Sequence, residues 1–222
     1  MSTTNVREKI IDYVIKTTEA SSLNSVHVSK LVKELGINRN TFYYHFDSKF
    51  DVAMYVFRLD LADALSKQIP QNHLLEAPLP LKPKPKPESL PYYMHREIGA
   101  RLLDHSDFFK SLVHCVTSRP QFYRKLFSVN EHEIKVRIFE LFRPAIENDV
   151  RFVLGGRFMP RDTFDFLVSQ QLETLYLIPC YHLANPSASR NLLDDTLNPF
   201  WNYPHETLMT ELQQHPIRKP RL

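Results

Sequence analysis

The chain has 222 residues, a formal net charge of +3 and only four glycines. The length allows one large domain or two modest ones, either of which would bury enough surface to fold without disulfides. So few glycines disfavour a Gly-rich phosphate loop or a fold with many tight β-turns, and a hydrophobic fraction of 43% disfavours wholesale disorder. These features favour a helical, all-α protein.

No apolar stretch approaches the roughly 18 to 20 residues of a membrane span, and the N-terminal sequence lacks the apolar core of a signal peptide. Cys115 and Cys180 are too few for a disulfide framework or a cysteine-based zinc site. The ten histidines are scattered without metal-ligand spacing. We therefore expect a cytoplasmic protein with no membrane partner, no metal and no cofactor.

Two helices are predicted at the start of the chain. Apolar residues at i, i+4 spacing predict a first amphipathic helix over 5–17. A second, shorter helix follows Ser25, a plausible N-cap, and stops at Gly36, which suits the left-handed residue after a helix end.

A third and a fourth helix follow closely. Asn38 is a good N-cap for a third helix on which Phe42 turns inward, so that polar and aromatic side chains gather on the outward face. Ser48 and Asp51 form the Ser-x-x-acid pattern that opens a fourth helix, expected to run to about Gln68.

A Pro/Lys-rich linker is predicted over 71–91, and its proline-dense part, 77–91, is predicted to be a stiff polyproline II connector. Its alternating Lys82, Lys84 and Lys86 are either solvated or in contact with DNA phosphate. Beyond it, helical periodicity predicts five or six further helices, over 94–105, 107–117, 120–127, 131–154 and 161–184. Gly155 and Gly156 should end the fourth of these, and the tail around Trp201 cannot form one regular helix.

The outward face of the third helix has the chemistry of DNA recognition. Arg39 can donate two hydrogen bonds to guanine, and Asn40 can pair with adenine. Tyr43 and Tyr44 can meet thymine methyl groups or phosphate. Two short helices joined by a tight turn, with such residues on the second, predict a helix-turn-helix.

The sequence HVSKLVKELGINRNTFYYHFDSKFDVAMYVF (27–57) resembles the DNA-binding domain of the TetR transcriptional regulators. The resemblance extends from about Val6 to Arg58 and is most specific over 41–46 and at Lys49. It departs from the usual family pattern at Asn40, where a small residue is common, and in the proline-rich connector. Lys49 also lies at a predicted helix start, which independently favours a bound phosphate.

The resemblance implies three parts: a three-helix, helix-turn-helix DNA-binding domain (1–70), a linker (71–91) and a helical ligand-binding and dimerisation domain (92–222). A dimer also follows from the mode of binding, since a palindromic operator needs two reading heads. The residues expected to meet DNA are Ser25, His27, Arg39, Asn40, Thr41, Tyr43, Tyr44 and Lys49.

The C-terminal part is less determined. Its long helix over 161–184 is either a dimer helix or a buried core helix. An apolar or aromatic effector would use a pocket for which Phe109, His114, Phe139 and Tyr176 are candidates, although such rings also commonly fill a core.

The sequence therefore predicts a ligand-responsive repressor that binds a palindromic operator as a homodimer. The alternative is a TetR-like adaptor or co-regulator that acts mainly through a protein partner, with Trp201 as an anchor. An enzyme is not expected. The closest catalytic pattern, His132-Glu133 of a metalloprotease motif, has Val136 where the second histidine belongs.

Overall fold

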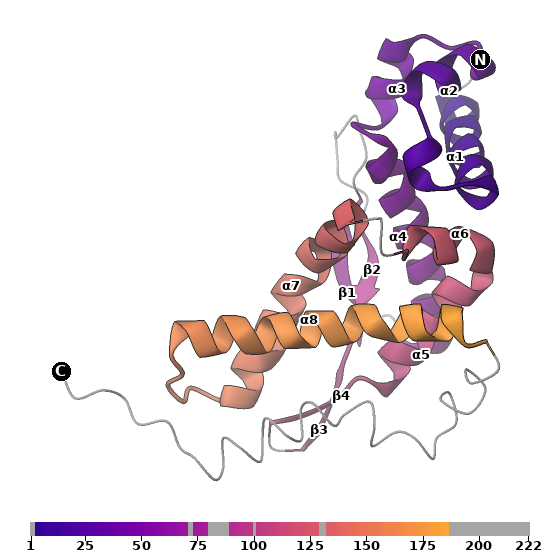
Figure 1. Cartoon of the computed structure of the whole chain (residues 1–222). Coiled ribbons are helices and arrows are strands. Elements are labelled where there is room, and N and C mark those ends of the chain that lie inside the picture. Colours follow the sequence, from indigo (N-terminus) through magenta and orange to yellow (C-terminus); the bar gives the residue numbers. More distant parts are fainter. Residues whose placement is uncertain (1–2, 71–72, 80–88, 100, 129–131, 187–222) are drawn as a thin grey trace.

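The structure is a computed structural model and describes residues 3–70, 73–79, 89–99, 101–128 and 132–186 (Figure 1). The described part is mostly helical, as the sequence predicts. It also contains two short antiparallel sheets of two strands each, which an all-α prediction leaves out. No described helix combines the length and apolar character needed to cross a membrane.

The N-terminal region forms the expected succession of helices. They are α1 (Thr3–Ala20), the 3₁₀ turn η1 (Leu23–Ser25), α2 (Val28–Leu35), α3 (Arg39–His45) and α4 (Lys49–Gln68). Figure 1 shows α1, α2, α3 and the first turns of α4 together at one end of the molecule.

Local signals set most of these helix ends. Gly36 adopts φ +64° after α2, as the sequence predicts. The Asn38 side-chain oxygen caps α3 by accepting hydrogen bonds from the Thr41 N–H (2.7 Å) and hydroxyl (2.9 Å). Ser48 caps α4 by accepting from the Asp51 N–H at 3.2 Å. The predictions for these three ends are confirmed.

The prediction that Ser25 caps the second helix is wrong. Ser22 caps the turn η1, and its side chain accepts the N–H of Ser25. The N-cap of α2 is His27, which makes no side-chain capping bond. The serines before α2 thus form their hydrogen bonds within a separate 3₁₀ turn. As a result, α2 begins two residues later than it would with Ser25 as its N-cap.

Helix α4 connects the two ends of the molecule. All its residues from Asp51 to Arg58 are buried, because α4 is covered on several sides. It packs against α1 at the N-terminal end and against α5, α7 and β2 further along. One continuous apolar core therefore runs along α4, from Phe46 through Phe57 to Phe142.

The connector prediction needs correction. Strands β1 (Leu75–Pro78) and β2 (Ser89–Tyr93) pair antiparallel, so the described ends of the segment turn back on each other instead of forming an extended spacer. Pro78 and Pro91 are tolerated because each strand of a two-stranded sheet is an edge strand. The lysines at 82, 84 and 86 lie outside the described residues.

Arg58 holds this sheet to α4. Its guanidinium donates to the carbonyls of Pro78 (3.1 Å), Ala77 (2.8 Å) and Leu90 (2.9 Å). Burial lowers the pKa of Arg58 to about 10, so it remains a cation at neutral pH. A contact between residues far apart in the sequence thus gives the proline-rich segment its conformation.

The predicted helix over 94–105 is also wrong. Strands β3 (Arg96–Gly99) and β4 (Leu102–Asp104) form a second antiparallel pair instead. Ile98 and Leu102 are exposed, so the helical apolar pattern that they suggested is not used for burial. Arg101 has φ +67°, a turn conformation that ends regular helix.

Four helices complete the described part: α5 (Ser106–Ser118), α6 (Pro120–Leu126), α7 (His132–Leu154) and α8 (Arg161–Ala184). They agree with the four remaining predicted helices. Gly155 and Gly156 follow α7 with φ +55° and +81°, as expected for a helix end. Helix α8 packs against α5, α6 and α7 (Figure 1). The segment around Trp201 lies outside the described residues.

Candidate functional site

Helix α3 presents a polar and aromatic surface at the N-terminal end of the molecule. Arg39 and Asn40 in its first turn are exposed. Tyr43 and Tyr44 in the next turn are 48% and 49% exposed. Arg39 lies one helical turn before Tyr43, and Asn40 one turn before Tyr44, so the four side chains form two adjacent rows along the helix. We call these four residues the α3 face.

The opposite side of α3 is fully packed. Phe42 and Phe46 are buried, and Tyr43 meets Phe42 edge to face with the ring centres 5.3 Å apart. His45 is also buried, and its burial, followed by the charge of Arg7, lowers its pKa. His45 therefore lies at the edge of the core. This packing fixes which residues the α3 face presents.

The other predicted DNA-binding residues lie around the starts of α2, α3 and α4. Thr41 is half-buried and takes part in the α3 cap. His27 is exposed at the N-cap of α2, while Ser25 is half-buried in η1 and contacts Ser21 and Ser22. Ser25 and Thr41 are thus less exposed than the residues of the α3 face, whereas His27 is exposed as they are.

Lys49 has a structural contact that the sequence does not show. Its ammonium donates to the Asn24 carbonyl at 3.0 Å and lies over the Phe50 ring, 5.4 Å from its centre. It therefore joins the start of α4 to the turn η1, next to Ser25. An ammonium has three N–H groups, so this contact is compatible with a further anionic partner.

Ion pairs join this end of the molecule to the remaining helices. Asp51, two residues after Lys49, pairs with Arg137 of α7 at 2.7 Å. Further along α4, Asp60 accepts from Arg119 at 3.0 Å and from Tyr123 at 2.7 Å. The helix that follows the α3 face is thus fastened to α7 and to the α5–α6 region.

The four candidate pocket residues do not share one site. Phe139 and Tyr176 meet edge to face, with Lys135 over both rings at 5.3 and 5.5 Å. Phe109 packs against His105 and Phe108. The structure thus brings only Phe139 and Tyr176 together.

His114 lines a separate cavity of about 420 Å³ between α4 and α5. The lining includes Asp60, Asp63, Lys67 and Arg119, and it contains none of the other three candidates. Charged side chains make this cavity unlike the apolar pocket expected from the sequence.

One face of α8 is exposed and partly apolar. Phe166 is 67% exposed, Leu177 64% and Tyr181 46%, and Gln170 and Glu173 lie between them on the same side. Steps of three and four residues align these side chains along the helix. The same helix buries Leu172 and Leu175 against the core, so α8 is both a core helix and the carrier of an unburied face.

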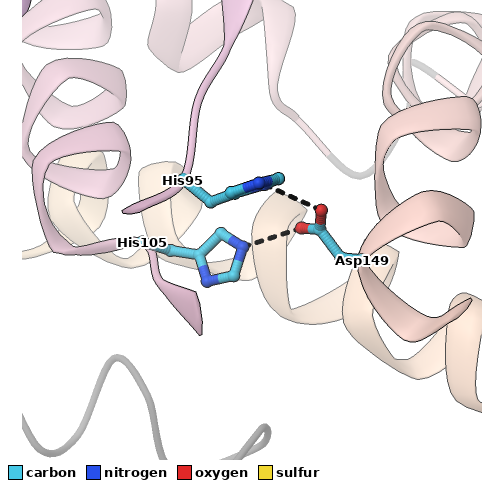
Figure 2. Close-up of side chains that lie close together, drawn as sticks. All are labelled: His95, His105 and Asp149. Atoms are coloured by element: carbon cyan, nitrogen blue, oxygen red, sulfur yellow. Dashed lines mark hydrogen bonds and ion pairs between the residues drawn. The ribbon is translucent and has the colours of Figure 1, made fainter. Parts of the chain in front are cut away.

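A buried polar cluster of His95, His105 and Asp149 was not found by sequence reasoning (Figure 2). His105 Nε2 and Asp149 Oδ2 lie 2.8 Å apart, and His95 Nδ1 lies 2.9 Å from Asp149 Oδ1. Burial opposes the ionisation of Asp149, but its contacts with His105 and His95 outweigh burial and hold its pKa below the ordinary value. The three residues follow no ligand spacing, so the sequence carries no signal for them.

Comparisons with protein-family models, with curated proteins and with solved structures found no match for this chain.

Proposed function

We propose that this protein is a sequence-specific DNA-binding regulator in which α2 and α3 form a helix-turn-helix. The observation that supports this most strongly is the α3 face. Arg39, Asn40, Tyr43 and Tyr44 are exposed on a short helix whose other side is buried. A helix of this kind can enter the major groove, where Arg pairs with guanine and Asn with adenine.

The exposure of two large aromatic side chains on α3 also supports this function. Two adjacent tyrosines, each about half exposed, gain little for the fold, yet they offer rigid contact area and a hydroxyl to a partner. The resemblance of 27–57 to the TetR DNA-binding domain points the same way. In this proposal Thr41, Lys49, Ser25 and His27 add contacts to the phosphate backbone.

A dimer is part of the proposal. One α3 face covers only a half-site, and a palindromic operator places its half-sites about one DNA turn apart. The exposed side of α8 offers Phe166, Leu177 and Tyr181 to a second copy. A regulator of this type works where the DNA is, so the cytoplasm is its proposed location.

The proposed mode of action is repression controlled by an effector, a small apolar or aromatic molecule. An effector changes operator affinity only if it favours one arrangement of the two reading heads. Asp51–Arg137 and the Asp60 contacts connect α4 to the helices that would hold such a molecule. They are the route by which binding there would alter the spacing of the α3 faces.

The test begins with selection of bound duplexes from a random DNA pool by the purified full chain. We expect a palindrome to be enriched, and the logarithm of its affinity to fall linearly with the logarithm of salt concentration. Arg39→Ala should then weaken binding by about 5- to 150-fold, with relaxed specificity at a single position of each half-site.

Arg161→Ala is the matched control, because it removes the same charge from an exposed site at the start of α8. It should leave the sequence preference unchanged. If no sequence is enriched and Arg39→Ala behaves like Arg161→Ala, direct reading of DNA is wrong. The adaptor function, through a protein partner, would then replace it.

A further inference from the structure

We propose that His95, His105 and Asp149 bind a divalent transition-metal ion, with Zn²⁺ the best-suited ion. The three side chains come from separate parts of the chain: His95 lies between β2 and β3, His105 directly follows β4, and Asp149 lies on α7. Figure 2 shows both rings pointing at the two oxygens of one carboxylate. All the candidate ligand atoms lie within 4.8 Å of one another.

The charge of the cluster favours a cation. Asp149 and His105 are 1% and 2% exposed, so the carboxylate is removed from water. Its two oxygens face His95, His105 and the Tyr93 hydroxyl. A buried anion requires a compensating positive charge, which a bound metal ion supplies directly.

The contact between His95 and Asp149 is the second observation that points to an ion. His95 Nδ1 and Asp149 Oδ1 are both buried and only 2.9 Å apart, and neither has a further hydrogen-bond partner among the described residues. Two such atoms, both aimed at one small space, have the arrangement of two ligands of a common ion.

A supporting hydrogen bond orients the carboxylate. The Tyr93 hydroxyl donates to Asp149 Oδ2 at 2.6 Å. Hydrogen bonds of this kind to a ligating carboxylate are the usual second layer of a protein metal site.

The site also has an approach for an ion. His95 is the exposed member of the cluster, with 26% of its side chain accessible. It lines a cavity of about 670 Å³ together with His73 and Glu97. An ion and one water molecule as a fourth ligand can enter from this side. Because His95 is partly exposed, its ring has room to turn inward.

Ligand chemistry selects the ion. Two imidazole nitrogens and one carboxylate oxygen suit Zn²⁺ and its neighbours rather than Mg²⁺ or Ca²⁺, which prefer oxygen ligands. Tetrahedral Zn²⁺ with bonds of about 2.0 to 2.1 Å keeps its ligand atoms roughly 3.3 Å apart. The candidate ligand atoms lie within 4.8 Å of one another, so they must draw together by at most about 1.5 Å to reach this spacing.

The test uses the full chain, stripped of metal with a chelator and titrated with Zn²⁺ against a chromophoric competitor. We expect one tight equivalent per chain. His95→Gln and His105→Gln should each weaken it by about 100-fold or more. His114→Gln is the matched control, since His114 is exposed on α5 outside the cluster, and it should stay within about threefold of the unmodified chain.

Co²⁺ substitution in the unmodified chain gives an independent reading if His105→Gln does not fold. Visible d–d bands without a thiolate charge-transfer band would support nitrogen and oxygen ligands. Burial raises the pKa of Cys180 to about 11, so that thiol is protonated at neutral pH. A thiolate band, no tight equivalent of Zn²⁺, or equal losses in His95→Gln and His114→Gln would overturn the proposal. None of these readings depends on DNA binding.

Discussion

The segment from Gly36 to Asp51 and the segment from Pro70 to His105 acquire their structures in different ways. In the first, short-range bonds set the helix ends: Asn38 to Thr41 and Ser48 to Asp51. In the second, the strands are held from outside, by Arg58 of α4 and by Asp149 of α7. The helix ends of the first segment are set by hydrogen bonds within the segment. The strands of the second segment depend on contacts with residues more than ten positions away in the sequence.

This difference has a consequence for function. A locally determined α3 can present the same face in different environments, as a groove reader requires. A segment that depends on distant contacts responds to whatever changes those contacts, including a ligand at His95 and His105. The comparison therefore fits the proposed recognition role of the first segment, and it predicts that the second segment responds to changes elsewhere in the fold.

The largest expected effect comes from Arg58→Met, which keeps most of the buried stem but removes the donors to three carbonyls. Unsatisfied buried acceptors should lower the free energy of unfolding by about 3 kcal/mol. Urea unfolding followed by circular dichroism measures this loss. Hydrogen exchange should also show loss of amide protection in β1 and β2 but not in α3. A loss below about 1 kcal/mol would mean that the strands do not depend on Arg58.

Asp51 lies in the locally determined segment, but it pairs with Arg137 of the distant helix α7. We expect a smaller effect from breaking this ion pair. The Asp51 side chain is 11% exposed and that of Arg137 29%, so the ion pair is partly shielded from water. A double-mutant cycle with Asp51→Asn and Arg137→Gln should give a coupling energy of about 1 kcal/mol. Additive losses would show that the start of α4 and α7 are not energetically coupled through this pair.

An effect of similar size, but confined to α3, is expected for Asn38→Ala, which removes the α3 cap. It should cost about 1 kcal/mol of unfolding free energy and reduce amide protection within α3 alone. Asn38→Ser retains a capping oxygen and should be nearly neutral, and so should Asn40→Ala on the exposed face. Protection lost in β1–β2 as well would contradict the local character of this segment.

The sequence by itself determined the helices at both ends of the described chain. Gly36, Asn38 and Ser48 act on backbone groups within a few residues, so their effects can be read without a fold. Burial of Phe42 and exposure of Tyr43 and Tyr44 followed from helical spacing for the same reason. Helix caps and helical spacing act between residues that are close in the sequence, so they can be predicted from the sequence alone.

Only the tertiary structure decided the strands and the histidine cluster. Prolines exclude helix from the connector but do not choose between an extended spacer and a strand pair, and Arg58 makes that choice. His105 and Asp149 are separated by more than forty residues, and no local pattern joins them. Their contact exists because β4 and α7 pack together in the folded chain.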